Sequence, residues 1–126
     1  MNAQNIGPDF DPIVEAALLG IRVRHRDDAD DLGELDLRRR TITTRPGTRA
    51  YVRTTVTYQL AYAVLGTGAT REQAIEWAAS LLIPDDDLYA LASATDDRAL
   101  WARALQVRPC LLLAHAAMLG GLPVAA

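Results

Sequence analysis

The spacing of hydrophobic and polar positions divides the chain into two parts. Between residues 21 and 44, hydrophobic residues alternate with polar residues over short stretches, which is typical of half-buried β-strands. From residue 49 onward, hydrophobic residues recur at three- and four-residue steps, which predicts amphipathic helices. We therefore expect an α+β fold. A small antiparallel sheet of about three strands should pack on a central helix, followed by an all-helical C-terminal half.

The longest helical pattern covers residues 49–66 and predicts the central helix. Thr48 is a suitable N-cap, and Gly66 and Gly68 end the pattern. One face of this helix is hydrophobic: Val52, Val56, Leu60, Ala63 and Val64. A second stripe is polar and aromatic: Tyr51, Thr55, Tyr58 and Tyr62. A helix with two such faces is expected to be buried on two sides.

The chain before the central helix predicts one short helix, with flexible residues 1–8 in front of it. Asp11 is the expected N-cap and Pro12 the first helical residue, because an aspartate accepts hydrogen bonds from the first turn and proline has no N–H to satisfy there. Gly20 ends this helix.

Three segments between the two helices predict strands. Residues 21–26 alternate strictly, residues 33–38 alternate through their leucines, and residues 40–44 are rich in β-formers. Two of the connections look too short for crossovers, so we expect the strands to be antiparallel.

Four helices are expected after the central helix. Residues 70–73 fit a capping box, and Pro84 is followed by three aspartates that match the positive end of a helix dipole. Two further helices are expected over residues 99–106 and 109–119. The chain thus forms one domain, residues 1–126, in which residues 11–66 precede a helical part, residues 70–119.

Composition narrows the class of protein. The formal net charge is -3 and the isoelectric point is near 5.2, which argues against general nucleic-acid binding. A single cysteine, Cys110, excludes an intrachain disulfide and a cysteine-rich zinc site. No apolar stretch approaches the ~18 residues of a membrane span, and the N-terminus lacks the pattern of a signal peptide. We expect a cytoplasmic protein without membrane contact.

The middle of the central helix has the spacing of a zinc-peptidase motif without its chemistry. The motif H-E-x-x-H needs two imidazoles on one helix face and a carboxylate beside the first to activate the bound water. Here Tyr58 and Tyr62 stand at the imidazole positions, and Gln59 stands at the carboxylate position. A phenol is protonated at neutral pH, and a carboxamide cannot accept a proton from water.

Four segments carry a wider pattern. Residues 33–42 are similar to a strand pair that contains a glycine, an acidic residue and an R-x-I stretch. Residues 57–66 are similar to A-H-E-L-G-H-A-L-L-G, and residues 71–84 to E-x-x-A-N/D-x-F/W-A-A-x-L-L-M-P. Residues 99–113 are similar to the closing helical pair. In this order, the segments resemble the ImmA/IrrE family of small zinc-dependent peptidases, which occur in phages, mobile elements and stress-response systems.

The resemblance implies a zincin-like minimal metallopeptidase fold whose metal site is lost. The family's two histidines and its third ligand, a glutamate, fall on Tyr58, Tyr62 and Arg71, and its general-base glutamate falls on Gln59. Glu72 lies one residue beyond the ligand position, about 100° further around the helix. We therefore expect no catalytic residue, no bound metal and no cofactor, so that the protein is not an enzyme.

For function, the resemblance implies binding without cleavage. Members of the family act on a helix-turn-helix repressor encoded nearby. A non-catalytic relative is expected to bind such a repressor, or another protein, in the gene regulation of a phage or mobile element. The candidate pocket residues surround the degenerate motif: Tyr51, Thr55, Tyr58, Gln59, Tyr62 and Glu72. The alternative is that the tyrosines only fill the volume of the lost site, with their hydroxyls bonded inside the core.

Two other hypotheses remain open. A Tyr58 or Tyr62 hydroxyl would serve an unconventional hydrolase, although no base stands near either in the sequence. Alternatively, the apolar residues 111–123 favour a structural module that forms a homo-oligomer. The arginines of residues 21–26 suit either an acidic partner or the protection of an edge strand.

The remaining metal-ligating residue types do not show ligand spacing. His25 and His115 are far apart, and Cys110 is not one helical step from His115. We expect His25 to be partly buried in its strand and Cys110 to be a small core residue. Residues 27–31 read as a solvated acidic turn.

Overall fold

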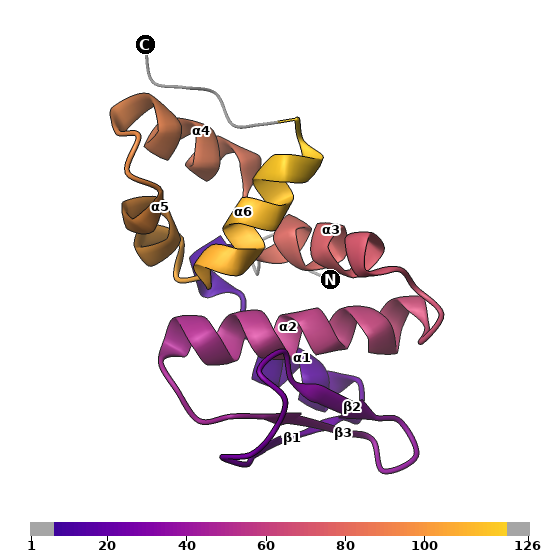
Figure 1. Ribbon diagram of the computed structural model, residues 1–126. Coiled ribbons are helices and arrows are strands. Elements are labelled where there is room, and N and C mark those ends of the chain that lie inside the picture. The colour runs from indigo at the N-terminus through magenta and orange to yellow at the C-terminus, as the bar shows by residue number, and fades with distance from the viewer. Residues whose placement is uncertain (1–6, 121–126) are drawn as a thin grey trace.

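Helix α2 (Arg49–Leu65) crosses the middle of the molecule (Figure 1). The computed structural model describes residues 7–120. Helix α1 (Pro12–Leu18) and the strands lie on one side of α2, whereas the helices that follow α2, together with the N-terminal turn of residues 7–9, lie on the other side (Figure 1). The α+β class and the helical C-terminal half are thus confirmed.

The first described elements are a 3-10 turn, Gly7–Asp9, and helix α1 (Pro12–Leu18). Asp11 caps α1 as expected, because its carboxylate accepts hydrogen bonds from two N–H groups of the first turn. Of the segment expected to be flexible, residues 1–6 lie outside the described residues, and Gly7 is buried.

The sheet consists of β1 (Arg22–His25), β2 (Glu34–Asp36) and β3 (Thr41–Thr44), in the order β1-β3-β2. β2 and β3 are antiparallel, but β1 pairs with β3 in parallel, so the expectation of an antiparallel sheet is wrong for β1. A parallel pair needs a crossover of about a dozen residues or more. Residues 26–40, which include β2, form this crossover between β1 and β3. The prediction considered only the short connections between consecutive strands.

The hydrophobic face of α2 packs on the sheet and on α1. Val56 and Leu60 are fully buried in a cluster with Ala16, Ile21 and Ile42. The two termini of α2 follow the prediction. The Thr48 hydroxyl accepts a hydrogen bond from the N–H of Tyr51, and Gly66 follows the helix with a φ of 104°. Val64, expected on the same face, is 49 % exposed in the last turn.

Four helices on the other side of α2 enclose a second core: α3 (Arg71–Leu82), α4 (Asp85–Ala94), α5 (Arg98–Leu105) and α6 (Pro109–Met118). The capping box at the start of α3 is present, and α6 begins at Pro109 as expected, whereas Pro84 is the N-cap of α4 and α4 begins at Asp85. The larger buried side chains of this core are Ile75, Leu82, Leu88, Trp101, Leu105 and Leu112. Trp77 is half-buried and packs against both cores, so it joins the two parts of the domain.

Arg53 ties distant segments to α2. Its guanidinium is 4 % exposed and donates hydrogen bonds to the carbonyl oxygens of Gly7 at 2.6 Å and Gln106 at 2.8 Å. Longer bonds reach the carbonyls of Phe10 and Leu105, both at 3.3 Å. Carbonyls at the end of α5 suit a cation because they carry the negative end of the helix dipole. Burial lowers the pKa of Arg53, with the charge of Arg49 as a smaller cause.

Surface exposure corrects two expectations. His25 is exposed rather than partly buried, because it ends the edge strand β1. Cys110 is exposed rather than a core residue, because it lies in the first turn of α6. In the segment expected to self-associate, Leu111 and Leu112 are buried in the helical core, whereas Leu113, Met118 and Leu119 are exposed. Within residues 7–120, no helix combines the length and apolar character needed to cross a bilayer.

Candidate binding site

A small cavity of about 60 Å³ opens between α2, α3 and α6, beside the degenerate motif. Its lining combines apolar side chains with two guanidinium groups, three hydroxyls and a thiol. The lining residues are Leu32, Thr54, Thr55, Tyr58, Arg71, Ile75, Arg108, Cys110, Leu111 and Ala114. Thr54, Thr55 and Tyr58 share one face of α2 because they stand at helical steps. The turn after α2 reverses the chain so that α3 runs back along α2 (Figure 1), and Arg71 at the start of α3 lines the cavity.

Tyr58 and Tyr62, at the two imidazole positions of the motif, bind each other. Their hydroxyl oxygens are 2.9 Å apart, and their rings pack edge to face with centroids separated by 5.3 Å. Burial raises the pKa of Tyr58 to about 12, and the hydrogen bond to Tyr62 adds to this effect. Both the ring packing and the hydroxyl contact therefore involve a neutral phenol at Tyr58.

Arg71, which the sequence resemblance aligned with a third ligand position, lies at the edge of the cavity. It is the first residue of α3, and it is exposed. Within residues 7–120, the Arg71 guanidinium makes no hydrogen bond or ion pair. Its positive charge acts to lower the pKa of Tyr58, but this effect is smaller than that of burial, which raises it. Glu72, one residue further on, is exposed and is not part of the lining.

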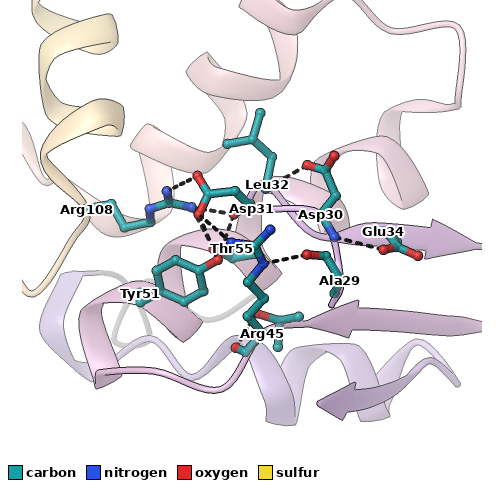
Figure 2. Close-up of polar contacts among 10 residues, drawn as sticks. Ala29, Asp30, Asp31, Leu32, Glu34, Arg45, Tyr51, Thr55 and Arg108 are labelled. Carbon is teal, nitrogen blue, oxygen red and sulfur yellow. Dashed lines mark hydrogen bonds and ion pairs between the residues drawn. The ribbon is translucent and has the colours of Figure 1, made fainter. Parts of the chain in front are cut away.

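Arg108 belongs to a polar cluster beside the cavity (Figure 2). Its guanidinium donates to the Asp31 carboxylate at 2.6 Å, to the Asp31 carbonyl at 2.7 Å and to the Thr55 hydroxyl at 3.2 Å. It also stacks over the Tyr51 ring, 4.4 Å from the centroid, and the Tyr51 hydroxyl donates to Asp31 at 3.0 Å. The hydrogen bond from Arg108, followed by that from Tyr51, lowers the pKa of Asp31. Asp31 therefore remains a carboxylate that neutralises Arg108.

The β1–β2 loop, residues 26–33, is fixed to α2 by side chains that bond its backbone. The Gln59 amide donates to the carbonyls of Leu32 at 2.7 Å and Gly33 at 3.2 Å. Arg45 also donates to the Ala29 carbonyl (Figure 2). A loop held in this way presents Leu32 to the cavity in a fixed position.

Gly33 permits the close approach of this loop. Its φ is +83°, a left-handed conformation that side chains rarely adopt. A Cβ at this position would lie 2.9 Å from the Thr55 methyl and 3.0 Å from Gln59. The loop comes close enough for the Gln59 amide to donate to the carbonyls of Leu32 and Gly33. A carboxylate at this position could not donate these bonds.

Of the six pocket residues that the sequence suggested, Thr55 and Tyr58 line the cavity. Tyr51 and Gln59 bond the β1–β2 loop instead, as described above. Tyr62 contacts the hydroxyl of Tyr58 and borders a separate shallow depression with Gln59. The tyrosine pair thus combines the two alternatives, since one ring faces the cavity and the hydroxyls are bonded to each other.

Sequence reasoning missed the contribution of α6 and of the β1–β2 loop to the cavity. Arg108 meets Asp31 across 77 positions of the chain, and no periodicity relates the two residues. One local signal existed, because Arg108 precedes the proline that starts α6. The Arg108 N–H donates to the Thr54 hydroxyl at 2.9 Å, and this bond docks the start of α6 on α2.

The residues at the motif positions do not fit a zinc ion. Two neutral phenols bonded to each other and one guanidinium offer no imidazole, thiolate or carboxylate ligand. In the part of the chain that the structure describes, no three side chains of His, Cys, Asp or Glu lie together as a metal site. No family model, curated protein or solved structure matches the chain. The function is therefore inferred from the cavity and its polar groups.

Proposed function

We propose that this chain is a metallopeptidase-like protein of the ImmA/IrrE type that binds a protein partner without cleaving it. The partner proposed is a helix-turn-helix repressor, in the gene regulation of a phage or mobile element. The binding region proposed is the cavity between α2, α3 and α6, together with its rim.

One observation carries this proposal: the hydroxyls of Tyr58 and Tyr62 bond each other at 2.9 Å where the motif requires two metal ligands. The cavity beside them is left with aromatic, aliphatic and cationic surface. Such a mixture of apolar walls and few polar groups is typical of binding sites. The cavity has no base to activate a water for hydrolysis, because Gln59 is an uncharged amide that is bonded to loop carbonyls.

Hydrolysis through a tyrosine is the weaker candidate. With a pKa of about 12, only about one Tyr58 phenol in 100,000 is ionised at pH 7. The nearest partner of its hydroxyl is another phenol, which is not a base at neutral pH. Self-association through residues 111–123 stays a separate hypothesis: Leu111 and Leu112 lie in the core, Leu113, Met118 and Leu119 are exposed, and residues 121–123 are outside the described part of the chain.

The proposal predicts that a helix-turn-helix repressor is encoded next to this protein, and it is tested with that repressor and the purified protein. We expect a stable complex and an intact repressor, measured by titration calorimetry and by mass spectrometry after prolonged incubation. In Ala114→Phe, an added ring fills the cavity, so the affinity for the repressor should fall at least about tenfold. Ala99→Phe is the matched control, because Ala99 is an exposed helix residue away from the cavity. Stoichiometric zinc, or cleavage that a chelator abolishes, would overturn the proposal.

The metallopeptidase-like scaffold has a separate test. The variant Tyr58→His, Tyr62→His, Arg71→Glu restores the three ligands at the family's positions, and we expect it to bind one zinc ion tetrahedrally with a water as the fourth ligand. The variant with only the two histidines is the control and should bind zinc far more weakly. If the triple variant folds, as judged by circular dichroism, and binds no zinc, the resemblance to the family has no structural basis.

A further inference from the structure

The size of the cavity limits what can enter it. A buried water needs about 10–15 Å³ of such space, so a volume of about 60 Å³ corresponds to roughly four to six waters. A leucine side chain has four carbon atoms beyond Cα, which lies within this range of heavy atoms. The cavity is thus large enough for one aliphatic side chain and too small for a tryptophan.

The walls of the cavity suit an aliphatic group. Leu32, Ile75, Leu111 and Ala114 contribute apolar surface from three different segments of the chain. Ile75 and Leu111 also belong to the buried core, so this part of the wall is fixed by packing. Transfer of an aliphatic group from water to such a wall is favourable by about 25 cal/mol per Å².

Among the side chains that line the cavity, Arg71 carries the one charge without an ion-pair partner within residues 7–120, and the Glu72 carboxylate, outside the lining, also acts on the Tyr58 phenol. Arg108 is neutralised by Asp31 at 2.6 Å, and it is held further by Thr55 and by the Tyr51 ring. Arg71 has no such partner within residues 7–120. The lining contains no Asp or Glu. A ligand with one negative charge beside its apolar group is therefore complementary to this site.

Tyr58 supplies a second polar contact. Either hydroxyl of the tyrosine pair is able to donate in their shared hydrogen bond. When Tyr62 donates, the Tyr58 proton is free for an acceptor in the cavity. A guanidinium and one hydroxyl match the two oxygens of a carboxylate, whereas a dianionic phosphate commonly engages a cluster of arginines.

We propose that this cavity binds an aliphatic side chain with a carboxylate next to it, and that Arg71 pairs with that carboxylate. Both groups belong to the proposed protein partner. The aliphatic group is a leucine-like residue of the partner, and the carboxylate is that of a neighbouring acidic residue or of the partner's C-terminus. This inference rests on the proposed function, since it names the chemistry that the partner presents to the same site.

The test uses small probes and the chain's single cysteine. Cys110 is exposed and lines the cavity, so a bound probe should slow its alkylation by iodoacetamide, a neutral reagent. The probes are 4-methylpentanoate, which joins a leucine-like group to a carboxylate, and 4-methylpentan-1-ol, which has the same shape without charge. For ligands of this size we expect half-protection at roughly millimolar carboxylate. The alcohol should need about ten times more.

Three variants assign the effect to the cavity. Arg71→Gln should remove the tenfold preference for the carboxylate and leave the weaker protection by the alcohol. Arg98→Gln is the matched control, because Arg98 is also an exposed first residue of a helix but is not part of the lining. Ala114→Phe fills the cavity and should abolish protection by both probes. Because each substitution can change the intrinsic reactivity of Cys110, the measured quantity is the ratio of rates with and without probe in each variant.

Equal protection by the acid and the alcohol, or no protection by either, would overturn the inference. A preference for the acid that survives Arg71→Gln would also overturn it. The two proposals fail separately. If the repressor binds but the cavity shows no preference for the carboxylate probe, only this inference is wrong. If the cavity prefers the carboxylate probe but the repressor does not bind, only the proposed function is wrong.

Discussion

The two sides of α2 are held to the rest of the molecule by different physical means. On the sheet side, Val56 and Leu60 are fully buried against Ile42, and Gln59 adds hydrogen bonds to the β1–β2 loop beside this contact. On the helical side, Arg53 donates to carbonyls at the end of α5, Thr54 accepts from the N–H of Arg108, and the cavity lies near these contacts. The difference shows that α2 is closed against the sheet where aliphatic side chains fill the contact. On the helical side, polar contacts to distant segments accompany a space that a ligand can enter.

The largest effect is expected at the polar side. Arg53→Met removes hydrogen bonds to four carbonyls and leaves buried acceptors unsatisfied, so the free energy of unfolding should fall by about 3–5 kcal/mol. Arg49→Met, one turn earlier and with one exposed bond to Pro8, should change it by less than about 1 kcal/mol. Urea denaturation measures both. Similar small losses in the two variants would show that the Arg53 contacts contribute little.

A somewhat smaller loss is expected on the sheet side. Leu60 is 0 % exposed, and Leu60→Ala should lower the free energy of unfolding by about 2–4 kcal/mol through lost burial and a new cavity. Val64→Ala, one turn later at 49 % exposure, should stay within about 0.5 kcal/mol. An equal loss at both positions in urea titrations would contradict the burial of one face only.

The third prediction concerns the loop that lines the cavity. Gln59→Leu removes both bonds to the carbonyls of Leu32 and Gly33 and should cost about 1–2 kcal/mol. Hydrogen exchange should increase at the amides of residues 30–33 and stay unchanged in the β2–β3 turn, residues 37–40, which serves as the internal control. Unchanged exchange in both segments would show that Gln59 does not hold the loop.

The smallest effect is a pH dependence of stability from Asp31. Its pKa is lowered by Arg108 first and Tyr51 second, so its contribution is fully present above the unfolded pKa, near 3.9. It is lost as the pH falls through the lower folded value. Because the Asp31 side chain is 54 % exposed, we expect less than about 1 kcal/mol. Asp31→Asn should therefore be less stable than the wild type at pH 7 and about equally stable near pH 2, in urea titrations. A constant difference at both pH values would exclude the ion pair as its cause.

The sequence predicted those parts of the fold that depend on local patterns. Asp11, Thr48 and the Thr70–Gln73 box mark helix starts because capping uses neighbouring residues. The parallel pairing of β1 with β3 was missed, because it is decided by which strand enters the middle of the sheet. Of the candidate site, the sequence identified Thr55 and Tyr58, which share a helix face. It missed the roles of Gln59 and Arg108, which depend on a loop and a helix distant in the chain.

The contacts of Arg53 also impose an order on assembly. Its guanidinium joins Gly7, near the start of the chain, to Leu105 and Gln106, which are synthesised about a hundred residues later. During synthesis, Arg53 therefore cannot form its hydrogen bonds to Leu105 and Gln106 until the end of α5 has left the ribosomal exit tunnel. Until then the Arg53 guanidinium lacks two of its four carbonyl partners, those of Leu105 and Gln106.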